Sequence, residues 1–89
     1  MNLEIKKFGE ILTSRPAGRE AALISLAYNL ELKNAKSVSL DFTGILVMTP
    51  SWLSEFVQTL KEKGISQIHF LPSENPTVIS SIEFVEPEI

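Results

Sequence analysis

The fold is decided by one stretch in the middle of the chain, Val38–Leu60, with the sequence VSLDFTGILVMTPSWLSEFVQTL. From Val38 to Phe42 apolar and polar residues alternate, which is typical of a β-strand with one buried face. Thr49-Pro50 predicts a helix start, because proline keeps the preceding residue extended, as an N-cap must be, and loses no hydrogen bond at the first helical position. The helix then repeats apolar residues at the spacing of one buried stripe, namely Leu53, Phe56, Val57 and Leu60.

Between this strand and helix, residues 45–48 are all apolar, and we expect them to cross over as a nearly buried run. Downstream, Gly64 stands where a C-terminal helix cap belongs, and residues 67–71 predict a further strand ending before Pro72. Asn75-Pro76 repeats the cap-plus-proline pattern and predicts a short helix. Its expected inward residues are Val78, Ile79 and Ile82, and an acidic tail ordered in part by Phe84 and Val85 follows.

Upstream, Leu3 and Ile5 alternate with charged residues, which predicts a strand ending near Phe8. Residues 10–12 fit either a short additional strand or a loop. The segment 13–16, Thr-Ser-Arg-Pro, predicts a helix start, and the helix is expected to reach about Leu32. Its expected core stripe is Leu23, Leu26, Ala27 and Leu30. The order β-α-β-α-β-α predicts one small α/β domain, residues 1–89, with largely parallel strands.

The amino-acid composition argues against several kinds of site, location and partner for this chain. The chain has 89 residues and no cysteine, which excludes disulfides and thiolate metal sites. No segment approaches the roughly 20 apolar residues of a membrane span, and the N-terminus lacks the apolar run of a signal peptide, so we expect a cytoplasmic protein without membrane contact. The net charge is −3, and residues 37–89 carry most of the acid, which argues against nucleic acid as a partner.

Few residues offer chemistry. His69 is the only histidine and has no companion ligands, so we predict no metal, no cofactor and no enzyme activity. Asp41 lies near the end of a strand, where its carboxylate either accepts hydrogen bonds in the turn at Thr43-Gly44 or serves a catalytic or switch role.

The two predicted helix starts supply the other candidates. Thr49 and Ser51 place hydroxyls at a helix N-terminus, where capping and phosphorylation are both open. Arg15 and Arg19 lie four residues apart and share a helix face. That face either holds a phosphate or a partner carboxylate or, with Glu20 close enough to neutralise it, is an ordinary solvated face. Trp52 stands at the edge of the apolar stripe and either completes the core or anchors an interface.

The stretch LDFTGILVMTPSWL, residues 40–53, resembles the core sequence pattern of STAS domains. Together with Thr13-Ser14-Arg15 upstream and the Ser-Trp-Leu-Ser-Glu start of the helix, it is similar to the STAS-like family of unknown function. The resemblance extends from about Ile5 to Ile82. It implies a small βαβαβα domain of the anti-sigma factor antagonist type.

Those antagonists are non-enzymatic and bind a serine kinase of the histidine-kinase-like ATPase class. They are switched by phosphorylation of a serine at this helix N-terminus. An ungapped match places Pro50 at the phosphorylated position, and proline cannot accept phosphate.

The sequence thus predicts a protein-interaction module that contacts a partner, such as a histidine-kinase-like ATPase, through Thr49–Glu55 together with Arg15 and Arg19. A second copy of the chain, forming a homodimer, is a further option for the partner. The alternative is a nucleotide-binding or phosphoryl-accepting regulator switched at Thr49 or Ser51.

Overall fold

The strands form two small parallel sheets. The computed structural model describes all 89 residues. A three-stranded sheet has the order β1-β3-β5, and a two-stranded sheet pairs β2 with β4. Their bounds are β1 Asn2–Glu4, β2 Ile11–Leu12, β3 Ser37–Asp41, β4 Val47–Met48 and β5 Gln67–Phe70. The predicted α/β class and the parallel pairing are confirmed.

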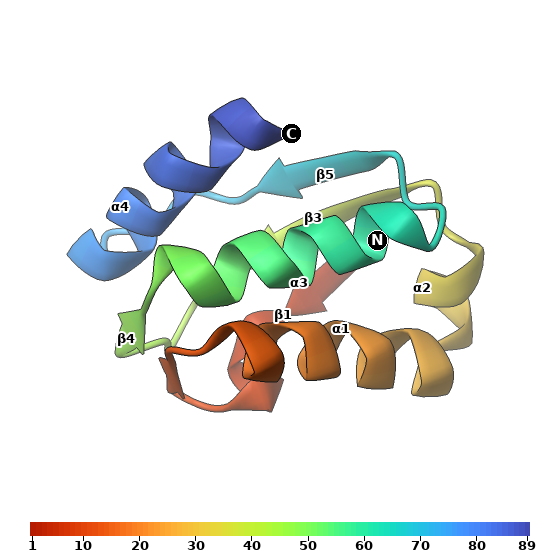
Figure 1. Cartoon of the computed structure of the whole chain (residues 1–89), viewed down its shortest axis with the longest axis horizontal. Coiled ribbons are helices and arrows are strands. Elements are labelled where there is room, and N and C mark those ends of the chain that lie inside the picture. Colours follow the sequence, from red (N-terminus) through yellow and green to blue (C-terminus); the bar gives the residue numbers. More distant parts are fainter.

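The helices cover one side of the larger sheet. They are α1 (Arg15–Tyr28), α2 (Leu30–Asn34), α3 (Pro50–Glu62) and α4 (Pro76–Val85), with 3-10 turns η1 (Ile5–Phe8) and η2 (Glu86–Glu88). Helices α1 and α3 lie side by side in front of the sheet, and α4 packs against α3 (Figure 1). The opposite face of the sheet carries polar side chains such as Ser39 and His69, which are register partners on β3 and β5.

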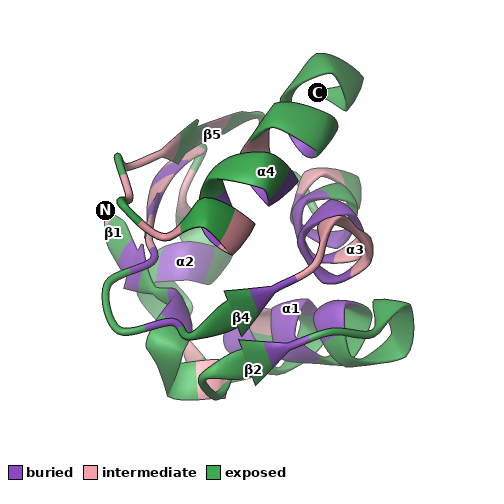
Figure 2. Ribbon diagram, turned by 90° about the vertical axis from the view of Figure 1, so that its left-hand side faces the viewer, coloured by how far each residue is buried: buried purple, intermediate pink, exposed green.

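The core lies between α3 and the sheet. All four residues of the predicted α3 stripe are fully buried, and so are Val38 and Leu40 on β3. Buried residues gather between the helices and the sheet in Figure 2. Gly64 ends α3 with a φ of 107°, and the Ile65 N–H donates to the Leu60 carbonyl at 3.2 Å. The strand, the helix and its glycine cap are therefore as the sequence predicts.

Helix α1 buries a different face from the expected one. Leu23 is exposed and Leu30 is 72% exposed, so the predicted stripe is wrong apart from Leu26, which is half-buried against the core. The buried residues are instead the small ones, Gly18, Ala21, Ala22 and Ser25. Small side chains let α1 approach α3 so closely that a Cβ on Gly18 would collide with the Trp52 carbonyl oxygen. Tight packing of backbones, rather than burial of the largest side chains, sets the orientation of this helix.

Two predicted boundaries in the first third of the chain are also wrong. The first strand ends at Glu4, because the chain then winds into η1 and leaves it at Gly9, whose φ of 120° favours glycine. The α1 helix ends at Tyr28 rather than near Leu32. Asn29 breaks the helix there, since it is the C-cap of α1 and its Oδ1 accepts the Leu32 N–H at 3.0 Å as the N-cap of α2.

The run 45–48 and the C-terminal helix differ in burial from the prediction. Ile45 and Met48 are buried, but Leu46 is 59% exposed. Val47 is also exposed, because Val47-Met48 pairs with β2 in a two-stranded sheet that has one open face. Helix α4 includes the expected tail as far as Val85, which is buried. Ile79 faces outward instead of inward, and Phe84 in the predicted tail is exposed.

Candidate functional site

The short sheet β2-β4 brings two helix starts together. Leu12 pairs with Met48, and the Thr49 N–H donates to the Leu12 carbonyl at 2.9 Å. Of the strand and the loop predicted as alternatives for residues 10–12, the strand is therefore the one that forms, as β2. Because β2 leads into α1 and β4 leads into α3, both helices begin at the same end of the molecule (Figure 2). The candidate residues Arg15 and Thr49, 34 positions apart in sequence, thus lie at neighbouring helix starts.

Thr49 and Ser51 differ in how far their hydroxyls are engaged. Thr49 is the N-cap of α3: its Oγ1 accepts the Trp52 N–H at 3.4 Å and donates to the Leu12 carbonyl at 3.4 Å. The capping role expected for Thr49 is confirmed. Ser51 is half-buried in the first turn of α3, and its hydroxyl has no intramolecular hydrogen bond. Of the two hydroxyls, that of Ser51 is the one free to react.

The two arginines of α1 form ion pairs with α3. Arg15 Nη1 lies 3.8 Å from Glu55 Oε2, and Arg19 Nη1 lies 3.8 Å from Glu55 Oε1. Arg19 also reaches Glu62 at 3.4 Å and donates to Thr59 Oγ1 at 3.3 Å. Glu20, named as the local neutralising group, takes no part in an ion pair. The neutralising carboxylates come from the neighbouring helix, which local sequence spacing does not show.

Trp52 takes the core role of its two expected roles. It is 1% exposed, and its ring stacks on Phe56 with centroids 4.9 Å apart. Phe8 of η1 approaches the same pair, with its ring centroid 6.3 Å from Trp52 and 5.6 Å from Phe56. A side chain enclosed in this way cannot touch a partner, so Trp52 as a partner-binding residue is wrong.

Asp41 supports the loop that follows β3. Its Oδ1 accepts hydrogen bonds from the Thr43 N–H at 2.9 Å and from the Thr43 hydroxyl at 2.7 Å. These bonds, that from the hydroxyl first, lower the pKa of Asp41 below its usual range. The turn-forming interpretation of Asp41 is confirmed. Neither of these bonds links it to the helix starts, so Asp41 is not part of that cluster.

The sequence prediction missed an apolar strip beside the helix starts. Ile11 is 64% exposed, and its register partner Val47 and the adjacent Leu46 are exposed with it. Register partners in a parallel pair point to the same side of the sheet, so Ile11 and Val47 form one surface. The signal in the sequence was the alternation of exposed and buried residues in Ile11-Leu12 and Val47-Met48, which two-residue strands make too short to recognise.

These residues define one surface at the end of the molecule where α1 and α3 begin. We call it the helix-start surface, and it consists of Ile11, Arg15, Arg19, Leu46, Val47, Ser51 and Glu55. It joins four of the predicted site residues to an apolar strip.

A scan of protein-family models and searches of curated proteins and of solved structures find no match to this chain. None of the helices combines the length and the apolar character that crossing a membrane requires. No three His, Cys, Asp or Glu side chains are grouped so as to hold a metal ion. The resemblance to STAS-like domains stays a prediction.

Proposed function

We propose that this chain is a non-catalytic, STAS-like interaction module that contacts a protein partner through the helix-start surface. The observation that carries the proposal is the apolar strip of Ile11, Leu46 and Val47, which is exposed where the chain leads into the two helices joined by the Arg15–Glu55 ion pair. Specific interfaces combine an apolar centre with a polar rim. Exposed apolar side chains that lie together mark interaction sites more often than single ones do.

The charged rim suits a partner that brings its own carboxylate. The Arg15 and Arg19 pairs with Glu55 are long, at 3.8 Å, and both arginines are exposed, while the Glu55 side chain is 24% exposed. Such pairs contribute only about 0–1 kcal/mol each, so exchanging Glu55 for a partner carboxylate costs little. A guanidinium can hold the new carboxylate with two hydrogen bonds. The class of partner that the resemblance implies is a histidine-kinase-like ATPase.

The test compares two charge insertions at apolar residues of equal exposure. Leu46→Glu changes the helix-start surface, and Phe84→Glu on α4 is the matched control, since the native side chains are 59% and 62% exposed. Each variant and the native chain serve as bait for affinity capture, and captured ATPases are then purified and titrated. We expect Leu46→Glu to weaken binding at least tenfold, because a buried charge without a partner is costly, whereas Phe84→Glu binds as the native chain does.

Equal binding by Leu46→Glu and the native chain, with both folded by circular dichroism, would rule out this surface. Light scattering on the purified chain tests whether it forms a homodimer. If the native chain is dimeric and Leu46→Glu is monomeric, then the partner at this surface is a second copy of the chain.

A second candidate function, a phosphoryl-accepting or nucleotide-binding regulator, draws support from Ser51 alone. Its hydroxyl lies unengaged in the first turn of α3, where free N–H groups and the helix dipole favour a phosphate. Ser51 is also one helical turn before Glu55, so a phosphate on it would compete for the same two arginines. Phosphorylation would therefore change the charge of the proposed binding surface.

Intact-mass measurement after incubation with the cognate kinase and ATP tests this candidate. One added phosphoryl group on the native chain and on Ser80→Ala, but none on Ser51→Ala, is the expected result. Ser80 is the matched control, because it is an exposed serine on another helix. An unmodified native chain whose melting temperature ATP leaves unchanged would exclude both forms of the regulator.

A further inference from the structure

A groove runs along α1 on a side that the helix-start surface does not use. It consists of two adjoining cavities of about 430 and 440 Å³ between η1 and α1, which share Lys7, Phe8 and Ile24. Each volume lies within the usual range for small-molecule sites, about 300–1,000 Å³. The first cavity continues to Ser25, Asn29 and Leu30, where α1 gives way to α2. Its walls are mainly apolar, and its polar groups are few.

Ser25 is the only buried polar side chain without a partner. It is 7% exposed, and its Oγ makes no hydrogen bond within the chain although it lines the first cavity. Leaving a buried hydroxyl unpaired costs about 1–3 kcal/mol. The Oγ itself is almost completely covered, so rotation of the Ser25 side chain about χ1 is needed for it to bond to a group in the cavity, and that bond would recover the free energy.

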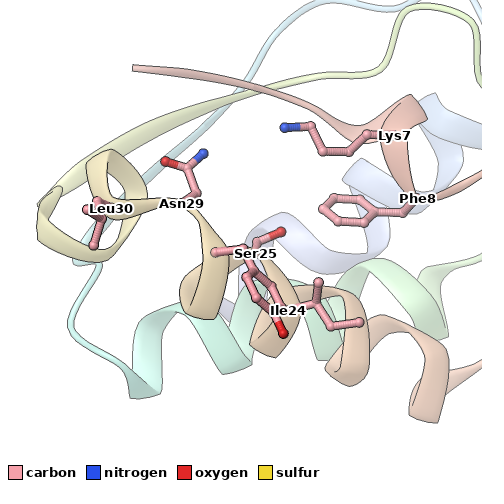
Figure 3. A pocket seen from close by; sticks show the side chains of 7 residues that line it. Lys7, Phe8, Ile24, Ser25, Asn29 and Leu30 are labelled. Carbon is pink, nitrogen blue, oxygen red and sulfur yellow. The ribbon is translucent and has the colours of Figure 1, made fainter.

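Two further donors face the same opening. Figure 3 shows the Lys7 ammonium and the Asn29 amide directed toward the space above the Ser25 hydroxyl, with the Phe8 ring at its side. Lys7 has no ion pair. Asn29 uses its Oδ1 to accept the Leu32 N–H, which leaves its Nδ2 free to donate. Lys7 is the one charged group in the lining of this first cavity, and the carboxylate of the groove, Glu20, lines the adjoining cavity.

We propose that this groove binds a small carboxylic acid with an apolar body. Lys7 supplies one positive charge, and Asn29 and Ser25 supply neutral donors for the two carboxylate oxygens. Phe8, Ile24 and Leu30 cover the apolar part. A phosphate is less suited, because the lining offers no arginine to hold it with paired hydrogen bonds.

The probe is 3-phenylpropanoate, compared with 3-phenylpropan-1-ol, which has the same apolar body without the charge. Amide resonances of the ¹⁵N-labelled chain are followed through a titration with each. We expect saturable shifts confined to the groove residues, residues 7–9 and 24–30. The alcohol should bind at least tenfold more weakly, since it loses the charge-assisted bonds.

Variants assign the affinity to the named groups. Lys7→Met should weaken 3-phenylpropanoate binding about tenfold and Ser25→Ala about fivefold, as expected for a charged and a neutral hydrogen bond. Lys7→Arg should retain binding. Lys63→Met, at an exposed lysine on another helix end, is the matched control and should bind as the native chain does. Because Ser25→Ala removes an unpaired hydroxyl, it should fold as stably as the native chain.

Three results would each overturn the proposal. One is equal affinity for the acid and the alcohol, and another is unchanged affinity in both Lys7→Met and Ser25→Ala. The third is absence of saturable shifts in the groove residues. None of them bears on the helix-start surface, whose test uses other variants.

Discussion

Replacing Gly18 with alanine tests the contact that sets the position of α1. A Cβ at this position would lie 3.0 Å from the Trp52 carbonyl carbon and 3.2 Å from its Cα, and closer still to its carbonyl oxygen. All three are backbone atoms in the first turn of α3. That turn is tied to β2 through the Thr49 N–H and the Leu12 carbonyl, so it cannot yield as a flexible side chain would. The alanine therefore forces α1 and α3 apart.

Two opposing contributions set the change in unfolding free energy that Gly18→Ala causes. Alanine is about 1 kcal/mol better than glycine inside a helix. Overpacking costs typically about 1–3 kcal/mol, and a clash with backbone belongs at the upper end of that range. Gly18→Ala should therefore lose about 2 kcal/mol of unfolding free energy. For a domain of this size, that loss lowers the melting temperature by about 10 °C.

Urea unfolding followed by fluorescence measures this loss, since Trp52 is the only tryptophan and is buried. Ala17→Gly on the exposed side of the same turn is the control, because it reports the helix-propensity term alone, about 1 kcal/mol. A Gly18→Ala chain that is as stable as the native one, or more stable, would refute the close approach of α1 to α3.

Three other substitutions test the remaining polar contacts. Glu55→Gln should lower the unfolding free energy by no more than about 1 kcal/mol, and the difference from the native chain should shrink at high salt, because both of its ion pairs are solvated. Hydrogen bonds from Thr43 lower the pKa of Asp41 in the folded chain below its unfolded value of about 3.8. The ionised carboxylate therefore stabilises the fold at every pH above the unfolded pKa. This stabilisation is lost as the pH falls through the folded pKa. Asp41→Asn should therefore be less stable than the native chain at pH 7 and equal to it in the most acidic buffers, as measured by urea titrations. Asn29→Ala should cost about 1 kcal/mol in thermal unfolding by removing the N-cap of α2; an unchanged melting curve would contradict that cap.

The part of the fold that the sequence predicts well is the part held by large side chains. In α3 the stripe from Leu53 to Leu60 is the only apolar face, so spacing alone identifies it. In the segment of α1 and the start of α2, two sets have the same spacing: Leu23, Leu26, Ala27 and Leu30, and Gly18, Ala21, Ala22 and Ser25. Hydrophobicity favours the first set. Close packing against the α3 backbone selects the second, and periodicity contains no information about that contact.

The contacts of the candidate site also divide into those that local sequence predicts and those that it does not. The capping bond of Thr49 and the turn bonds of Asp41 join groups within three residues, and the local pattern Thr-Pro-Ser or Asp-Phe-Thr is sufficient to predict those bonds. The second bond of the Thr49 hydroxyl, to the Leu12 carbonyl, is not predictable from local pattern. The partners of Arg15 and Arg19 lie 36 or more positions away on another helix. Such pairs depend on which faces of two helices meet, and that depends on Gly18.

The small-residue face of α1 therefore accounts for both proposed sites. With Gly18 and Ala22 against α3, the arginines of α1 lie next to Glu55, which builds the rim of the helix-start surface. The same orientation turns Ile24 and Leu30 away from the core and leaves them as walls of the groove beside η1. Had the leucine stripe faced the core, the arginines and the groove walls would both lie elsewhere. The exposed apolar residues of α1 and of the start of α2 are thus the consequence of a helix contact made by the smallest residues of α1.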